Sequence, residues 1–288
     1  MHLADSSLEP KSLIIRPTKG WLALNLGDIW EYRELLYFLV WRDIKVRYKQ
    51  TVLGFGWAII SPLMLTVVFT LIFGRLGNLP TDGLPKAVYY MAGLVIWRYF
   101  SQGLLNASNS LVGNAGMLTK IYFPRLLIPL GSIVTCAVDL GIALVMLGAI
   151  MAYYQTAPAI TTLLVPVLIL MAAAITLGVG LFFAALNVRF RDVRALLPLL
   201  VQLWMYITVI VPFSRIPERF GDWRYLYGLN PMAGVVEGFR WCLLHNVSGA
   251  SMAPPWALLA VGTPVTLIIL TAGLYYFRRV ESQFADIV

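Results

Sequence analysis

Six long runs of apolar residues, separated by shorter polar segments, dominate the pattern along the chain. A helix needs about 20 apolar residues to cross the hydrocarbon core of a bilayer, and most of these runs reach that length. The second run contains one charge, Arg98, and the third contains one, Asp139. The runs cover residues 55–73, 89–111, 127–153, 163–186, 196–212 and 256–277. The pattern predicts an all-α integral membrane protein, with six transmembrane helices in one domain over residues 54–288.

A mixed segment of residues 213–250 separates the fifth run from the sixth. Asn230 and Pro231 interrupt an apolar stretch within it, and this stretch is too short to span a bilayer simply. Glu237 and Arg240 lie one helical turn apart in the same stretch. We therefore expect an external re-entrant helical hairpin here, because non-helical backbone at membrane depth must be buried in protein.

Residues 31–53, ahead of the first run, mix apolar and basic side chains at roughly helical spacing. Leu35, Leu36 and Leu39 begin an apolar stripe, and cations follow on what we expect to be the flank facing headgroups and cytosol. This pattern predicts an amphipathic helix on the inner leaflet. A cationic topology anchor without a further role is the alternative. The candidate interfacial residues are Trp41, Arg42, Lys45, Arg47, Tyr48 and Lys49.

Composition and charge agree with a membrane protein. Hydrophobic residues make up 59% of the 288 residues and charged residues only 12%, whereas soluble domains carry about 25% charged residues. The formal net charge of +8 is better explained by topology and anionic lipid than by nucleic acid. Placing both termini in the cytoplasm puts most cations on that side. Residues 1–30 form a polar tail that lacks the pattern of a signal peptide.

Several patterns that carry chemistry are missing from the sequence. No G-x-x-x-x-G-K-[ST] phosphate loop and no G-x-S-x-G elbow occur, so we expect no catalytic site and no nucleotide hydrolysis in this chain. His2 and His245 are the only histidines, which argues against a histidine-rich metal site. Asp139 is the only carboxylate within the predicted spans, which is few for an ion-coupled carrier that relies on buried acidic relays.

Four segments, in order, are similar to one family. They are LVWRDIKVRYKQTVLGFGWAIISPLM, MAGLVIWRYFSQGLLNASNSLVGNAGMLTKIYFPR, LNVRFRDVRALLP and VPFSRIPERFGDWRYLYGLNPMAGVVEGFRW. With them the chain resembles, from about Glu34 onward, the permease subunits of ABC transporters that export polysaccharides such as O-antigen, capsule and teichoic acid. The resemblance implies a homodimer in the bacterial inner membrane, paired with separate ATPase subunits that hold ATP and Mg²⁺. The implied substrate is a lipid-linked glycan.

Two other functions compete with this one. An exporter of a small lipid or drug from the same superfamily would share topology and partners. A membrane-embedded glycan-modifying enzyme, such as an acyltransferase, would need histidines and carboxylates near one membrane face, and the chain offers few.

The resemblance also implies a coupling helix that enters a cleft of the ATPase subunit. Its residues are Lys120, Ile121, Tyr122, Phe123, Pro124 and Arg125. Aromatic side chains flanked by cations suit such an interface, and an ordinary interfacial turn with snorkelling cations is the alternative.

The intramembrane charges Arg98 and Asp139 lie at similar depths on neighbouring predicted spans. We expect a structural ion pair between them, with a polar role in a glycan path as the alternative. Trp97, Tyr99 and Phe100 adjoin Arg98, and they either line a passage for sugars or pack between helices.

Overall fold

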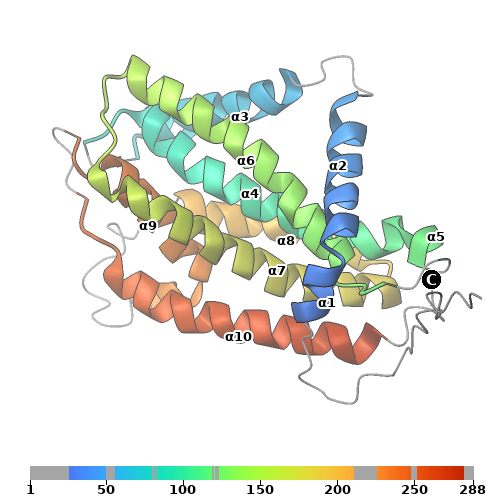
Figure 1. The fold of residues 1–288 in the computed structure, drawn as a ribbon. Coiled ribbons are helices and arrows are strands. Elements are labelled where there is room, and N and C mark those ends of the chain that lie inside the picture. Colours follow the sequence, from blue (N-terminus) through green and yellow to red (C-terminus); the bar gives the residue numbers. More distant parts are fainter. Residues whose placement is uncertain are drawn as a thin grey trace, which may run out of the picture.

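The computed structural model describes residues 26–49, 56–79, 83–118, 123–210, 226–247 and 252–281, together with Thr81 and Lys120. All regular secondary structure in these residues is helical, which confirms the all-α class (Figure 1). The helices are α1 (Leu26–Glu31), α2 (Arg33–Lys49), α3 (Gly56–Phe69), η1 (Thr70–Leu76), α4 (Lys86–Gly113), α5 (Ala115–Leu118), α6 (Leu127–Tyr153), η2 (Ile160–Leu164), α7 (Val165–Arg189), α8 (Val193–Met205), η3 (Tyr206–Ile210), α9 (Pro231–Leu244) and α10 (Trp256–Glu281).

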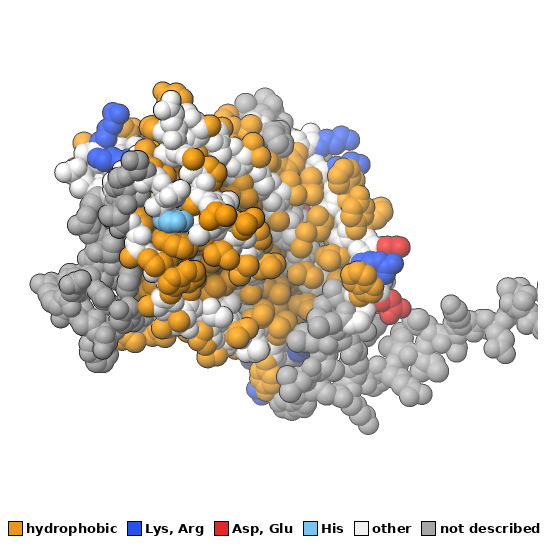
Figure 2. Space-filling view, turned by 60° about the vertical axis from the view of Figure 1, so that its left-hand side comes forward, with side chains coloured by type: hydrophobic (Ala, Val, Ile, Leu, Met, Phe, Trp, Pro, Cys, Tyr) orange, Lys and Arg blue, Asp and Glu red, His pale blue; other side chains and the backbone are white. Residues whose placement is uncertain are grey.

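Five helical segments are long and apolar enough to cross a membrane, by length and composition. They are Gly56–Leu76, Leu127–Tyr153, Ile160–Arg189, Val193–Ile210 and Trp256–Glu281, and each corresponds to one of the runs in the sequence. The protein is therefore a multi-pass membrane protein. Figure 2 shows one face with hydrophobic side chains spread across its middle and Lys and Arg side chains at its margins.

The remaining predicted span corresponds to α4, whose 28 residues measure about 42 Å as a helix. This helix carries several polar side chains, Asn106 and Asn109 among them, and is less apolar than its neighbours. It packs against α6 and α7, and most of its residues are buried. Because protein surrounds α4 on most sides, its polar residues meet other side chains instead of lipid.

Helices α7 and α10 cross in backbone contact at two glycines. A Cβ atom on Gly273 would lie 2.0 Å from the carbonyl oxygen of Gly178. A Cβ atom on Gly178 would lie 2.8 Å from backbone atoms of Ile269 and Leu270. Membrane helices associate through such small residues because lipid gives apolar side chains no solvent-driven reason to cluster.

Helix α2 crosses the direction of the long helices and packs on α6 near Gly131 (Figure 1). Leu39 is buried, but Tyr37, Phe38 and Trp41 are exposed. Apolar side chains therefore lie on two faces of α2, whereas the sequence predicted one apolar stripe. Arg47 also differs from expectation, because it lies on the side that faces α6 instead of the outer flank.

Helix α9 is too short to span a bilayer, since its 14 residues measure about 21 Å against a core of about 30 Å. Thirteen of its residues are buried, and it packs against α4, α7 and α10. The described part of the predicted hairpin is therefore a buried helix of less than the length of a span. The rest of the predicted hairpin, over residues 211–225, lies outside the described residues.

Candidate functional site

A charged cluster joins α2 to the long helices. It consists of Arg47 and Tyr48 on α2, Asp139 on α6 and Arg98 on α4. Arg47 Nη1 donates to Asp139 Oδ2, and the Tyr48 hydroxyl donates to Asp139 Oδ1. Asp139 therefore has a separate donor for each carboxylate oxygen. Both charges of the ion pair are partly buried, with 30% of the Arg47 side chain and 22% of the Asp139 side chain exposed.

The expected ion pair between Arg98 and Asp139 is wrong as a direct contact. Arg98 Nη1 instead donates to Ser61 Oγ on α3, at 2.8 Å. The prediction compared only the depths of the six runs, and it did not allow α2 to bring Arg47 to the same level. Arg98 still lines one small space with Asp139, so the two charges remain neighbours.

That space is about 10 Å³, enough for no more than about one water molecule. Tyr99, Gln102 and Cys136 complete its lining together with apolar side chains. Asn106 Nδ2 donates to Cys136 Sγ nearby, at 3.3 Å. A sugar ring does not fit into this space.

Tyr48 keeps its proton in this arrangement. Partial burial, followed by the hydrogen bond to Asp139, raises the pKa of Tyr48 above its ordinary value of 10.0. The phenol is therefore a hydrogen-bond donor to the carboxylate throughout the neutral range, and Tyr48 and Arg47 together fix the end of α2 against α6.

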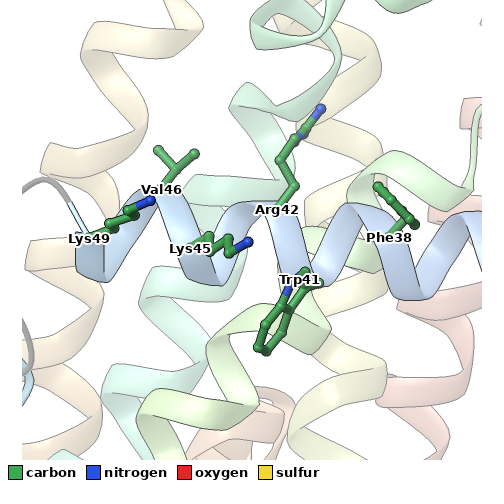
Figure 3. A pocket seen from close by; sticks show the side chains of 6 residues that line it. All are labelled: Phe38, Trp41, Arg42, Lys45, Val46 and Lys49. Atoms are coloured by element: carbon green, nitrogen blue, oxygen red, sulfur yellow. The ribbon is translucent and has the colours of Figure 1, made fainter.

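The outer face of α2 carries the remaining predicted interfacial residues. Figure 3 shows Trp41 and Arg42 pointing to opposite sides of the helix, with Lys45 and Lys49 along it. These residues, with Phe38 and Val46, line a shallow surface pocket of about 410 Å³. The Lys45 ammonium lies 5.8 Å from the centre of the Trp41 ring, within cation–π range. Cations beside exposed aromatic rings are typical of a helix at the headgroup level.

Arg42 also connects α2 to the end of α4. Its Nη2 atom donates to Asn114 Oδ1 at 2.9 Å, and it pairs with Asp43 at 2.8 Å. Asn114 follows the last residue of α4 and precedes α5, so this bond joins α2 to the segment that leads into the predicted coupling helix.

The predicted coupling residues differ in their exposure. Lys120 is exposed. Phe123 is only 5% exposed and packs in an apolar cluster with Leu39 and Phe277, so it serves the chain's own core and is not a free aromatic anchor. Pro124 is half-buried, and Arg125 Nη1 donates to the carbonyl of Glu281 on α10. Ile121 and Tyr122 lie outside the described residues.

A second charged group, fully enclosed, lies in α9. Arg240 has no exposed surface, and its Nη1 atom donates to Glu237 Oε1 at 3.0 Å and to the Tyr89 hydroxyl at 3.1 Å. Its Nη2 atom donates to the carbonyl of Val209 at 2.8 Å. Glu237 and Arg240, one helical turn apart, thus form a buried ion pair. The carbonyl of Val209 stands at the end of η3, where helical carbonyls lack partners within the helix.

Asn230 fastens the same helix end from the start of α9. Its Oδ1 atom accepts from Trp204 Nε1 at 3.0 Å, and its Nδ2 atom donates to Thr208 Oγ1 at 2.8 Å. Pro231 occupies the first turn of α9, where a missing N–H is tolerated. The predicted re-entrant residues therefore clamp the end of the fifth apolar run.

The aromatic residues beside Arg98 pack between helices. Trp97 and Phe100 are buried, and both contact the Trp204 ring, with centroids 5.9 and 5.0 Å apart. Tyr99 is 6% exposed. Trp97 and Phe100 therefore join α4 to α8, as expected if these aromatic residues pack between helices.

The sequence profile of the ABC-2 type transporter family matches residues 34–244, which is most of the chain. The chain belongs to this family. This ABC-2 transporter chain is 27% identical to the O-antigen export system permease protein RfbA of Klebsiella pneumoniae over 266 residues, covering 92% of this chain and 97% of that protein. It is 29% identical to the protein of the same name from Myxococcus xanthus, covering 90% and 97%. It is 27% identical to the polysialic acid transport protein KpsM of Escherichia coli, covering 83% and 91%.

Several residues that contact the charged groups of this ABC-2 transporter chain could not be predicted from the sequence. Tyr89 lies 151 positions from its partner Arg240, and Ser61 lies 37 positions from Arg98. Gly93 leaves the space for the Arg240 guanidinium, since a Cβ there would lie 2.4 Å from Nη2. Only the Glu237–Arg240 spacing was a usable local signal. Among the described residues, no group of three His, Cys, Asp or Glu side chains is placed to hold a metal ion.

Proposed function

We propose that this chain is the transmembrane subunit of an ATP-driven exporter that moves a lipid-linked polysaccharide across the bacterial inner membrane. The observation that carries the proposal is similarity over nearly the whole length of two O-antigen export permeases, one from Klebsiella pneumoniae and one from Myxococcus xanthus. A third relative is named for transport of polysialic acid, another long glycan. All three relatives are named for the export or transport of a polysaccharide.

The proposed assembly is two copies of this chain with two ATPase subunits. Membership of the ABC-2 family supports a separate source of ATP hydrolysis, because the sequence contains no phosphate loop. Exposed Lys120 and the adjoining residues are the proposed contact with the ATPase, and ATP and Mg²⁺ bind on that partner. Arg125 and Phe123 hold this segment to α10 and to the core.

The proposed orientation places both termini in the cytoplasm and uses α4 as the sixth span. The ends of α7 and α10 carry Arg189, Arg278 and Arg279, and Figure 1 draws these ends on the same side as α1 and α5. The opposite end carries Arg75 and Lys86. A cation-rich side is the cytoplasmic side of a bacterial inner-membrane protein.

The decisive experiment is deletion of the gene in the source bacterium, followed by complementation. We expect deletion to abolish the surface polysaccharide and to leave lipid-linked glycan inside, and the plasmid-borne gene to restore export. Immunodetection of surface glycan and extraction of the lipid-linked precursor measure the two pools. Normal surface glycan in the deletion strain, with altered export of a small lipid or drug, would reject the polysaccharide cargo.

Topology is tested separately with cysteine variants in loops on both sides. We expect membrane-impermeant thiol reagent to label Gln155→Cys, between α6 and α7, in intact spheroplasts. Lys120→Cys should become labelled only after the membrane is opened. Labelling of Lys120→Cys in sealed spheroplasts would reverse the proposed orientation.

A further inference from the structure

An apolar groove of about 750 Å³ lies between α6 and α7 at the end where residues 154–159 connect them. Figure 1 shows the two helices splayed apart toward this connection. Leu147 and Met151 on α6, Val165 on α7 and Leu243 on α9 are buried and line the groove. No lining residue carries a charge. The charged cluster and the α9 clamp lie elsewhere.

The surroundings of the groove face lipid. Val145 on α6 is 76% exposed, and Val167 and Leu170 on α7 are 61% and 69% exposed. These residues belong to two of the helices that are long and apolar enough to span a membrane. Within the bilayer, the medium next to such side chains is acyl chain. The groove therefore opens to lipid and not to water.

The length of the groove matches the thickness of one leaflet. Tyr153 and Tyr154 at the end of α6 are exposed, as expected of aromatic residues at the membrane interface. From Leu144 to Gln155 the lining covers 11 positions, or about 16 Å of helix. Half of a hydrocarbon core of about 30 Å is about 15 Å. A single fatty acyl chain of one leaflet matches this length, whereas a long prenyl chain exceeds it.

The mouth of the groove is polar at the same level. Gln155, Thr156 and Thr162 line it, next to the two tyrosines. The Thr156 hydroxyl already donates to the carbonyl of Met151, at 3.0 Å. Gln155 is exposed, and its side-chain amide makes no hydrogen bond with any residue that the structure describes. An amide N–H in this place can donate to the ester carbonyl of a glycerolipid.

We propose that this groove holds one acyl chain of a phospholipid from the external leaflet, with its ester at Gln155. Gly148 makes the space, because a Cβ built on this residue has no atom within 4 Å. The occupancy follows from the groove and its depth, and it does not depend on the exported cargo. Only the name of the leaflet rests on the orientation proposed above.

The test uses the full-length chain in nanodiscs of phosphatidylethanolamine and phosphatidylglycerol with a small fraction of phosphatidylethanolamine that carries a diazirine in its acyl chain. After illumination, mass spectrometry maps the labelled residues. We expect at least fivefold more label on Leu147, Met151 and Ile169 than on Val145 and Leu170, which face lipid outside the groove. Gly148→Leu fills the groove and should remove this excess. Gly141→Leu is the matched control, since Gly141 lies on the same helix, also in open space and outside the groove.

Three outcomes would overturn the proposal. Equal labelling inside and outside the groove, already in the unmodified chain, would mean ordinary contact with bulk lipid. Cross-links between these residues and a second copy of the chain would make the face an interface between copies. Excess label from a diazirine-bearing prenyl phosphate, but not from the phospholipid, would assign the groove to the carrier lipid. Because the first comparison needs no variant, poor folding of Gly148→Leu leaves the test intact.

Discussion

Asp139 illustrates how one carboxylate can tie a surface helix to a membrane helix. It accepts from Arg47 and from Tyr48, two neighbouring residues at the end of α2. A charge-assisted hydrogen bond contributes more than a neutral one, and partial burial reduces the competition from water. Because Asp139 pairs with Arg47, Arg98 donates to Ser61 instead.

Replacing Arg47 by Gln and Asp139 by Asn, singly and together, tests this contact. We expect each single change to lower the free energy of unfolding by about 1.5–3 kcal/mol, the range for a hydrogen bond to a charged group. The double change should cost clearly less than the sum. The measurement is thermal or denaturant unfolding in detergent, with Lys49→Gln on the exposed face of α2 as control. Arg98→Gln, alone and combined with Asp139→Asn, gives the second coupling, and a value larger than that of Arg47 with Asp139 would restore the ion pair that the sequence suggested.

Arg240 and Gly93 form a second pair that the residue scale can test. Gly93→Ala places a Cβ 2.4 Å from Arg240 Nη2, so the guanidinium must leave its partners. Displacing a buried charge from its pair costs roughly 3–5 kcal/mol. In an Arg240→Met background the same Gly93→Ala change should cost much less, because the flexible thioether can yield. Unfolding of the four proteins measures the coupling, and equal costs in both backgrounds would contradict it.

At the scale of elements, two kinds of contact hold the helices together. Polar side chains fasten α9 to η3 and to α4, through Arg240 and Asn230. Glycines bring α7 and α10 into backbone contact. Both kinds of contact are expected in a bilayer. Polar groups there need hydrogen-bond partners within the protein, and apolar helix surfaces associate only through close van der Waals packing.

Gly273→Ala tests the α7–α10 crossing. Its Cβ would lie 2.0 Å from a backbone oxygen, which no side-chain rotation relieves, so the helices must separate. We expect a loss of unfolding free energy at the upper end of the about 1–3 kcal/mol typical of overpacking. The control is Gly141→Ala, whose Cβ meets nothing within 4 Å. Thermal unfolding of both variants measures the difference, and a stable Gly273→Ala protein would place the two helices farther apart.

At the scale of the whole molecule, the described conformation has one end tied together and the other end clamped. α2, α5 and the end of α10 meet around Phe123, Arg125 and Arg42 at the proposed cytoplasmic end. α9 closes the opposite end with buried side chains. Between these ends, the space that Arg98 and Asp139 line measures only about 10 Å³. Phe123 and Arg125 follow exposed Lys120 in the chain, so this end adjoins the proposed contact with the ATPase subunit.

Lys120 and Phe123 allow partner binding to be separated from folding. Phe123→Ala removes a buried ring and should cost about 3–5 kcal/mol of unfolding free energy, with poor yield of the chain even without its partner. Lys120→Glu changes an exposed residue and should leave unfolding unchanged. We expect it to reduce co-purification of the ATPase subunit several-fold. Full association and export with Lys120→Glu would remove this residue from the proposed interface.

The sequence determined the features that depend on composition and local spacing. Long apolar runs predicted the all-α class and six spans, five of which are helices long and apolar enough to cross a membrane, because only a helix satisfies its backbone within the hydrocarbon. The spacing of Glu237 and Arg240 by one helical turn was visible in the sequence, and it is the spacing at which the two side chains pair in α9. Asn230 and Pro231 interrupted the apolar pattern, and α9 begins at this interruption.

Tertiary structure alone decided which distant groups meet. Arg47 turned inward to Asp139 because α2 crosses α6 at that level, and no periodicity along the chain encodes a crossing between separate helices. Phe123 is buried for a related reason, because it packs with Leu39 of α2 and Phe277 of α10 in one apolar cluster. Contacts of this kind depend on the relative placement of whole helices, which is set by the sum of their packing surfaces and not by any single segment.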